Sequence, residues 1–380
     1  MKVCGVICEY NPFHNGHQYQ LERARALSGA DYVVCAMSGP FVQRGDAAIL
    51  DKWTRAQSAL LSGADLVLEL PVLFAVRPAQ DFAFGGVALL HALGVVTHLS
   101  FGTEDDDPDR LSRLARPETP EETAAIRRYL EEGLSHPAAR ARAMGEDLPP
   151  NMTLAVEYIR AIRRLSGSME PVPVRRQYHH HDLTAHEMAS ATAIRLQLAQ
   201  GNDNLAHAMP ASALALLHNE LPSPLPSLSR FSDILLYLLR TTSPEELRTG
   251  YALVEGLENR LCRQAGISAD VDDLLARIKC KRYPMARLRR ILTQLLLGMT
   301  DELIRSHPTP EYARILGFRK SAAPLLHEIS HSASVPLISK AADAVPNPML
   351  SLDFRAQDIW DLAAGKPAHR DLTERIRVLP

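Results

Sequence analysis

The chain has 380 residues, of which 46% are hydrophobic and 23% charged, and its formal net charge at pH 7 is −2. At roughly 150 residues per domain, this length predicts two or three globular domains. The apolar fraction excludes a wholly disordered or collagen-like chain, and no apolar run approaches the roughly 20 residues that span a bilayer. The small net charge excludes a protein that is basic throughout but leaves room for a local basic patch.

The cysteines and the first residues of the chain bear on its compartment. The chain has five cysteines, an odd number, and no two of them are spaced as CxxC. We therefore expect neither a disulfide framework nor a zinc ribbon, and the predicted compartment is a reducing cytoplasm. The N-terminal residues lack the long apolar core of a signal peptide and are expected to form a first strand.

In chain order, the first hundred residues alternate strand-like and helix-like segments. Short apolar runs predict strands over residues 3–10, 31–39, 65–70 and 95–101. Helical spacing of apolar residues predicts helices over residues 18–27, 52–62 and 82–93. Because the strand runs are apolar throughout, both faces of the sheet are expected to be covered, which is typical of parallel strands. The predicted fold class is α/β with a parallel sheet.

An excursion interrupts this pattern before it resumes. Residues 104–150 are charged and rich in proline, and we expect them to leave the sheet and to carry one or two helices. The α/β pattern then continues with a helix over 151–165, a strand over 173–177 and a helix over about 192–199.

The second half of the chain has a different pattern. Residues 205–225 are rich in Pro and Ser, and beyond them helical spacing dominates while strand signals become rare. The sequence therefore predicts an α/β domain over 1–205, followed by a mostly α-helical domain over 206–380.

The strongest local signal is the turn after the first strand, EYNPFHNGH. Gly16 allows a ligand to approach the backbone, and the free N–H groups of a helix start suit phosphate oxygens. His14 and His17 share one helix face and would donate hydrogen bonds to an α-phosphate and its leaving pyrophosphate. The spacing alone also fits packing or capping histidines, or a metal pair. The position favours phosphate chemistry, because ligands of open α/β sheets bind at the carboxyl ends of strands.

A second motif, SATAIR, begins at Ser190. Ser190 and Thr192 can cap a helix and offer hydroxyls, and Arg195 can reach a triphosphate, although an ordinary helix cap with a surface arginine has the same pattern. In this order, NPFHNGH and SATAIR resemble the two signatures of the HxGH nucleotidyltransferase superfamily. The resemblance implies a Rossmann-like nucleotidyltransferase domain that activates a carboxylate or phosphate with a nucleoside triphosphate.

Longer segments resemble one bacterial family nearly from end to end. They include residues 37–71, FGTE at 101–104, KRYPMARLRRIL at 281–292 and YARILGF at 312–318. These segments resemble the tRNA(Met) cytidine acetate ligase family. The resemblance implies that ATP and acetate form acetyl-adenylate, and that the acetyl group passes to the wobble cytidine of elongator tRNA(Met) as N4-acetylcytidine. Mg²⁺ would arrive on the ATP phosphates, so no dedicated metal site is expected.

The resemblance also implies site residues. His14, His17 and Arg195 would be catalytic, and ATP would be bound by Ile7, Cys8, Glu9, Tyr10, Asn11, Pro12, Phe13, His14, Asn15, Gly16, His17, Gln18, Tyr19, Gln20, Gly102, Asn151, Arg175, Arg176, Ser190 and Thr192. Two departures from the family pattern leave questions open. After Arg175 and Arg176 the sequence differs from the family pattern, which leaves open which of the two arginines faces the nucleotide. Pro40 stands where the family has an asparagine, which leaves open any polar role at that position.

Two further polar groups have alternative interpretations. Ser38, Gln43, Arg44, Asp46 and Lys52 either line a pocket for acetate or the target cytidine, or form a loop with a helix cap. The run HHHD at 179–182 is expected to be a loop rather than a metal site, because adjacent histidines do not share one face.

A basic stretch in the helical half is the candidate RNA contact. Residues 275–320 hold eleven Lys and Arg against three acids. The predicted tRNA-binding residues are Lys281, Arg282, Tyr283, Arg287, Arg289 and Arg290, with Tyr283 stacking on a base. A solvated helix face has the same composition.

Two other functions remain possible from the sequence. One is a small-molecule adenylyltransferase of the same superfamily, which would leave the basic stretch unexplained. The other is a non-catalytic RNA-binding protein, which the intact His14, Gly16, His17 and Arg195 disfavour. We expect tRNA and acetate as partners, with no membrane and no obligate protein partner.

Overall fold

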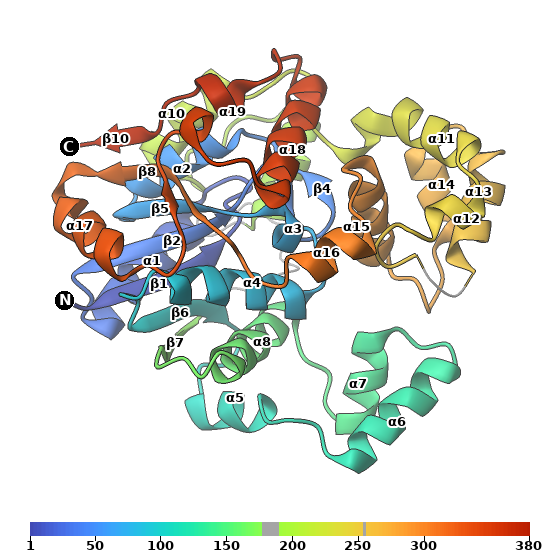
Figure 1. Cartoon of the computed structure of the whole chain (residues 1–380), viewed down its shortest axis with the longest axis horizontal. Coiled ribbons are helices and arrows are strands. Elements are labelled where there is room, and N and C mark those ends of the chain that lie inside the picture. Colours follow the sequence, from blue (N-terminus) through green and yellow to red (C-terminus); the bar gives the residue numbers. More distant parts are fainter. Residues whose placement is uncertain (177–189, 254–255) are drawn as a thin grey trace.

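The computed structural model describes residues 1–176, 190–253 and 256–380 (Figure 1). Within these ranges, eight strands form one sheet in the order β10-β8-β5-β2-β1-β6-β7, with β9 paired to β8. They are β1 Val3–Cys8, β2 Tyr32–Ser38, β5 Leu66–Leu70, β6 His98–Thr103, β7 Glu170–Arg175, β8 Ala313–Arg319, β9 Leu337–Ile338 and β10 Arg377–Leu379. Every pairing is parallel except that of β5 with β8. The predicted α/β class is confirmed, with one antiparallel junction.

Both faces of the sheet are covered, as the apolar runs predicted. In β1, Val3 and Ile7 pack into one core cluster, whereas Cys4, Val6 and Cys8 pack into the other. The first cluster includes residues of α3 Val72–Ala75, α4 Ala79–Ala92, α8 Pro150–Arg164 and α18 Pro348–Ala364. The second includes residues of α1 Asn15–Ser28, α2 Lys52–Leu61, α9 Ala191–Ala199 and α10 Ala211–Glu220. Because successive strand residues point to opposite faces, each run had to be apolar at every position.

The excursion is larger than expected. Residues 104–150, all of which the structure describes, hold three helices instead of one or two: α5 Pro108–Leu114, α6 Pro120–Glu131 and α7 His136–Met144. Proline stands in the first turn of each helix, where its missing N–H costs nothing. Figure 1 shows α6 and α7 standing away from the sheet.

The second half of the chain is helical at first and then returns to the sheet. Its first part holds α11 Ser232–Thr241, α12 Pro244–Leu247, α13 Leu257–Ala265, α14 Val271–Ile278, α15 Met285–Leu296 and α16 Asp301–Ser306. After these come β8, α17 Ala323–Ser332, β9, α18, α19 Arg370–Thr373 and β10. Strands after residue 205 were expected to be rare, yet β8, β9 and β10 complete one edge of the sheet. Residues 206–380 are therefore not a purely helical unit.

Arg314 explains why the sequence did not indicate a buried strand at β8. Its guanidinium interrupts the apolar run, but Glu69 on the neighbouring strand (3.0 Å) and Asp371 before β10 (2.6 Å) both accept from it. All three side chains are buried. Buried charges are tolerated when they are paired, and these partners are too far apart in sequence for a local pattern to reveal.

Strand ends differ from the predictions by a few residues, as at β6 and β7, which begin at His98 and Glu170. Among the residues that the structure describes, no helix is both long and apolar enough to cross a membrane.

Candidate functional site

His14 and His17 form a reciprocal cap at the start of α1. The Gly16 N–H donates to His14 Nδ1 at 3.0 Å, and the His14 N–H donates to His17 Nδ1 at 3.3 Å. The two rings stack with their centroids 3.6 Å apart. A neutral imidazole whose Nδ1 accepts carries its proton on Nε2. The backbone therefore sets the tautomer of both rings and leaves each Nε2–H available as a donor.

Both histidines are held neutral at pH 7. Burial, together with the charges of Arg176 and Arg195, lowers the pKa of His14 from 6.5 to about 3. Burial likewise lowers the pKa of His17, with His14 and Arg176 contributing. A site that combines neutral N–H donors with nearby guanidinium groups favours an anionic ligand over a cation.

The second motif lies against the first. Arg195 Nη1 donates to the carbonyl of Asn11 at 2.6 Å, and its Nη2 donates to Thr192 Oγ1 at 3.2 Å. Ser190 is the N-cap of α9, where its Oγ accepts from the Ala193 N–H at 3.2 Å. The sequence predicted that these two distant motifs meet, and in the structure Arg195 of the second motif contacts Asn11 of the first.

A third segment completes the basic side of the site. Arg176 Nη1 donates to Asn151 Oδ1 at 3.4 Å, and Asn151 Nδ2 donates to Glu104 at 2.7 Å. The ideal Cβ position of Gly102 lies 3.6 Å from the side chain of Arg176. Arg175 is exposed, whereas Arg176 lies close enough to lower the pKa of both histidines. Arg176 is therefore the arginine of this pair that faces the histidine site.

Other side chains at the end of β1 and in the loop to α1 are buried and support the loop. Tyr10 and Phe13 are buried and pack edge-to-face with centroids 4.8 Å apart, and Tyr10 lies 4.8 Å from the His17 ring. Asn11 Oδ1 accepts from the Ile49 N–H at 2.9 Å. Ile7 and Cys8 are also buried, in the two cores. These residues fix the loop that carries the histidines.

Arg55 is a structural residue that the sequence analysis missed. It is fully buried, and its guanidinium donates to the carbonyls of Glu9 (2.7 Å) and Ser38 (2.9 Å) and also to that of Gly39. The sequence signal that could have revealed its role is a charged residue within the apolar helix predicted over 52–62. Arg55 ties the end of β1 to the end of β2, directly beneath the histidine loop.

The polar cluster at residues 38–52 does not act as one group. Lys52 is fully buried and pairs with Glu69 and Asp371, each at 2.7 Å, so it does not line a pocket for acetate or cytidine. Asp46 accepts from the Leu228 N–H at 2.6 Å and from Arg289 at 2.9 Å. Lys52 is part of the core, because two carboxylates from other segments neutralise its charge there.

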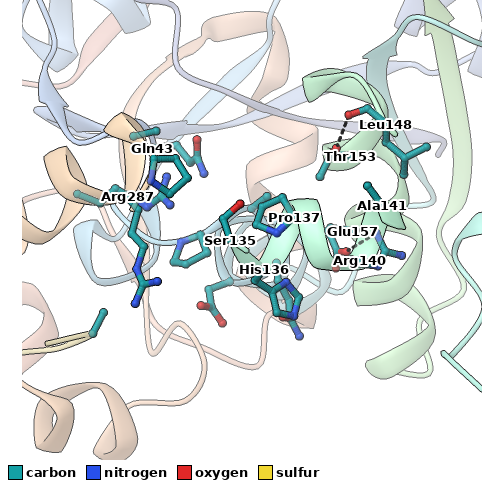
Figure 2. Close-up of a pocket in the computed structure, with 18 of the residues that line it drawn as sticks. Gln43, Ser135, His136, Pro137, Arg140, Ala141, Leu148, Thr153, Glu157 and Arg287 are labelled. Atoms are coloured by element: carbon teal, nitrogen blue, oxygen red, sulfur yellow. Dashed lines mark hydrogen bonds and ion pairs between the residues drawn. The ribbon is translucent and has the colours of Figure 1, made fainter. Parts of the chain in front are cut away.

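Of the five residues of this cluster, Gln43 lines a cavity. Gln43 lines this space of about 580 Å³ together with Arg287 and Arg290 of α15 (Figure 2). Its backbone N–H donates to Glu9 Oε1 at 2.6 Å. Ser38 is buried, and Arg44 is exposed.

The predicted RNA-binding residues divide into exposed, paired and buried ones. Lys281 is exposed, Arg282 is partly exposed, and Arg289 is paired with Asp46. The expectation for Tyr283 is wrong: its ring is 5% exposed and lies under Arg287, at 5.1 Å, so no base can stack on it. The Tyr283 ring packs in the helical core. The basic residues next to it in the sequence had suggested an exposed position instead.

Two basic residues counted in the stretch 275–320 also have structural roles. Arg314 belongs to the buried ion pairs of β8, and Arg319 donates to the carbonyl of Leu60 at 2.6 Å. The run 179–182 lies outside the described residues. Among the residues described, no group of three or more His, Cys, Asp or Glu side chains is placed to hold a metal ion.

Comparisons with known proteins agree with this geometry. The model of the HIGH Nucleotidyl Transferase family matches residues 1–375. The tRNA(Met) cytidine acetate ligase of Acetivibrio thermocellus is 36% identical, with 97% of each chain covered. That of Leuconostoc mesenteroides is 35% identical, with 97% of this chain and 96% of the relative covered.

Solved structures give the same result over the whole chain. The apo structure of Thermotoga maritima TmcAL has a TM-score of 0.93 at 31% identity, and each chain is covered completely. The structure of the same protein bound with alpha-thio ATP has a TM-score of 0.91 at 30% identity, again with complete coverage. The paired histidines, the arginine of the second motif and these full-length similarities together show that the chain belongs to the HIGH nucleotidyl transferases and, among them, to the tRNA(Met) cytidine acetate ligase family.

Proposed function

We propose that this protein is an ATP-dependent ligase that activates acetate as acetyl-adenylate and transfers the acetyl group to the wobble cytidine of elongator tRNA(Met), forming N4-acetylcytidine. The observation that carries the proposal is the contact of Arg195 with the loop of His14 and His17, in a chain whose full-length relatives carry this name. That contact brings two neutral N–H donors and a guanidinium to one anion-binding site.

In the first step, an acetate oxygen attacks the α-phosphorus of ATP, and the bond to pyrophosphate breaks. Acetate is ionised at pH 7, so no general base is needed, and positioning two anions is the main demand. The Nε2–H groups of His14 and His17 donate to the α-phosphate and to the leaving pyrophosphate, where negative charge develops. Arg176 and Arg195 supply positive charge for the phosphates, and Mg²⁺ would arrive on ATP without a protein cage.

In the second step, the cytidine N4 amine attacks the acetyl carbon, the bond to AMP breaks, and the amine loses one proton. The base must leave its stack to reach the mixed anhydride. The exposed or partly exposed basic residues of this region, Lys281, Arg282, Arg287, Arg289 and Arg290, are the proposed tRNA contacts.

One assay series tests this function against the alternatives. ATP–pyrophosphate exchange is measured with and without acetate, and transfer of labelled acetate is measured with and without tRNA(Met). The proposal predicts acetate-dependent exchange without RNA, and label in tRNA only when ATP is present. Exchange with no labelled tRNA would indicate a small-molecule adenylyltransferase, and RNA binding without exchange would indicate a non-catalytic protein.

A further inference from the structure

A large cavity lies between α7 of the excursion and α15. Its volume is about 580 Å³, and its walls come from α4, α7, α8 and α15 and from the turn between β3 Phe41–Val42 and β4 Asp46–Ala47 (Figure 2). Pockets of roughly 300–1,000 Å³ enclose most of a ligand the size of a nucleotide. The lining residues do not include His14, His17 or Arg195, so the cavity is separate from the adenylation site.

The α15 wall of the cavity favours an anion. It presents Arg287 and Arg290, and burial lowers the pKa of Arg290 to about 10, with the charges of Arg287 and Arg44 contributing. The Arg290 guanidinium is thus partly buried near two others, with Asp81 and Tyr251 offsetting only part of this effect on its pKa. A bound phosphate would relieve the repulsion between these guanidinium groups and accept charge-assisted hydrogen bonds.

The opposite wall is mixed: it holds Arg140, paired with Glu157, and an apolar patch on α7. Pro137, Ala141 and Met144 come from α7 or its first turn, and Ile291 of α15 lies across from them. In Figure 2, Gln43 and Arg287 lie on one side of the space and Ala141 on the other. The two arginines of α15 and this apolar patch match the two halves of a nucleotide, because a guanidinium binds phosphate and an apolar surface contacts the base.

The β3–β4 turn connects this cavity to the adenylation site. At one end, Gln43 N–H donates to Glu9 Oε1 at 2.6 Å. At the other end, Gly45 has a φ of +75° and lies so close to α15 that a Cβ would collide with the backbone of Arg289 and Arg290. Only glycine allows both this conformation and this approach. The turn therefore holds the carboxyl end of β1 and the basic face of α15 side by side.

Charges of both signs lie along this connection, since the carboxylates of Glu9 and Asp46 are close enough to act on the pKa of Arg195 in the raising direction. Arg44, in the same turn, lies close enough to lower the pKa of both Arg195 and Arg290. An RNA strand leaving the cavity would pass Arg44 on its way to Arg195 and the adenylation site.

We propose that the cavity binds one nucleotide of the single-stranded RNA loop that carries the acceptor cytidine, with its phosphate on Arg287 and Arg290 and its base against α7. The inference rests on the proposed function. It also assigns a role to the excursion, because α7 and α15 would contact opposite sides of the bound nucleotide. Single-stranded loops present unstacked bases to such a site, whereas a duplex does not.

The first test fills the cavity from the α7 side. Ala141→Trp places an indole in the cavity, and Ala138→Trp, at an exposed α7 position that does not line it, is the matched control. Binding of a fluorescein-labelled RNA stem-loop with cytidine in its loop is measured by anisotropy, together with acetyl transfer and RNA-free ATP–pyrophosphate exchange. We expect Ala141→Trp to raise the Kd for RNA at least tenfold and to lower transfer, with exchange within twofold of wild type. The control is expected to behave as wild type.

The second test removes a charge. Arg287→Ala is compared with Arg263→Ala, an exposed arginine of α13 that does not line the cavity. We expect only Arg287→Ala to lower the slope of log K against log salt, by about 0.7 for one single-strand phosphate contact. Equal effects of both members in each pair would refute the proposal.

Three other results would also decide between the possibilities. A loss of RNA-free exchange in Ala141→Trp would assign the cavity to adenylation and overturn the inference. If wild-type protein acetylates tRNA and both cavity variants do so with unchanged RNA affinity, only the cavity inference fails. If the wild-type protein produces no acetylated tRNA, the proposed function itself fails.

Discussion

Replacing His14 with serine separates its two roles. Nδ1 of His14 caps α1 by accepting from the Gly16 N–H at 3.0 Å, and this leaves Nε2–H for the ligand. Serine is also a preferred N-cap, but its side chain is too short to replace the Nε2 donor. His14→Ser is therefore expected to keep the cap while it loses one hydrogen bond to the developing charge. Removing one such donor from an acyl- or phosphoryl-transfer site costs about 2.7–4 kcal/mol, or about 10²–10³ in rate.

The control for this prediction is His14→Ala, which removes both the cap and the donor. Loss of an N-cap costs about 1 kcal/mol, so His14→Ala is expected to unfold more easily than His14→Ser by that amount. Both variants lose the stacking of His14 on His17, so the difference between them isolates the cap. The measurements are acetate-dependent ATP–pyrophosphate exchange and urea unfolding. Exchange within threefold of wild type in His14→Ser would refute the catalytic role, and equal stability of the variants would refute the capping role.

Three further predictions concern pH, the second motif and the buried ions. The folded pKa of His14 is about 3, so as the pH falls below 6.5 His14 binds a proton in the unfolded chain but not in the folded protein. His14 therefore lowers the free energy of unfolding by about 1.4 kcal/mol for each pH unit of acidification, until the folded pKa is reached. Between pH 7 and pH 5, His14→Ser should lose less free energy of unfolding in urea than wild type. Arg195→Lys keeps the charge but loses the paired bonds to Asn11 and Thr192, so exchange should fall while the Kd for tRNA stays within twofold; a large loss of tRNA affinity would contradict this placement. Lys52→Met leaves two buried carboxylates without this partner and should cost about 3–5 kcal/mol of unfolding free energy; unchanged stability in urea would show that the ion network is not needed for the fold.

The sequence by itself determined the α/β core and the two motifs of the site. Apolar runs with helical spacing between them are local patterns, and they located β1, β2, β5 and β6 to within a few residues. The histidine motif at the end of β1 was also readable, because a helix start after a buried strand follows from neighbouring residues. The order of the motifs and the resemblance of long segments supplied the family, which the comparisons confirmed.

Only the tertiary structure decided which charged and aromatic side chains are buried. Lys52 was one of five candidates for either a pocket or a capped loop, and Tyr283 was expected to stack on a base, yet the fold encloses both. Arg176, not Arg175, approaches the histidines because the pleat of β7 and its end orient the two side chains differently. The cavity between α7 and α15 is formed by segments more than a hundred residues apart. Such contacts depend on long-range packing and charge pairing, which leave no periodic pattern along the chain.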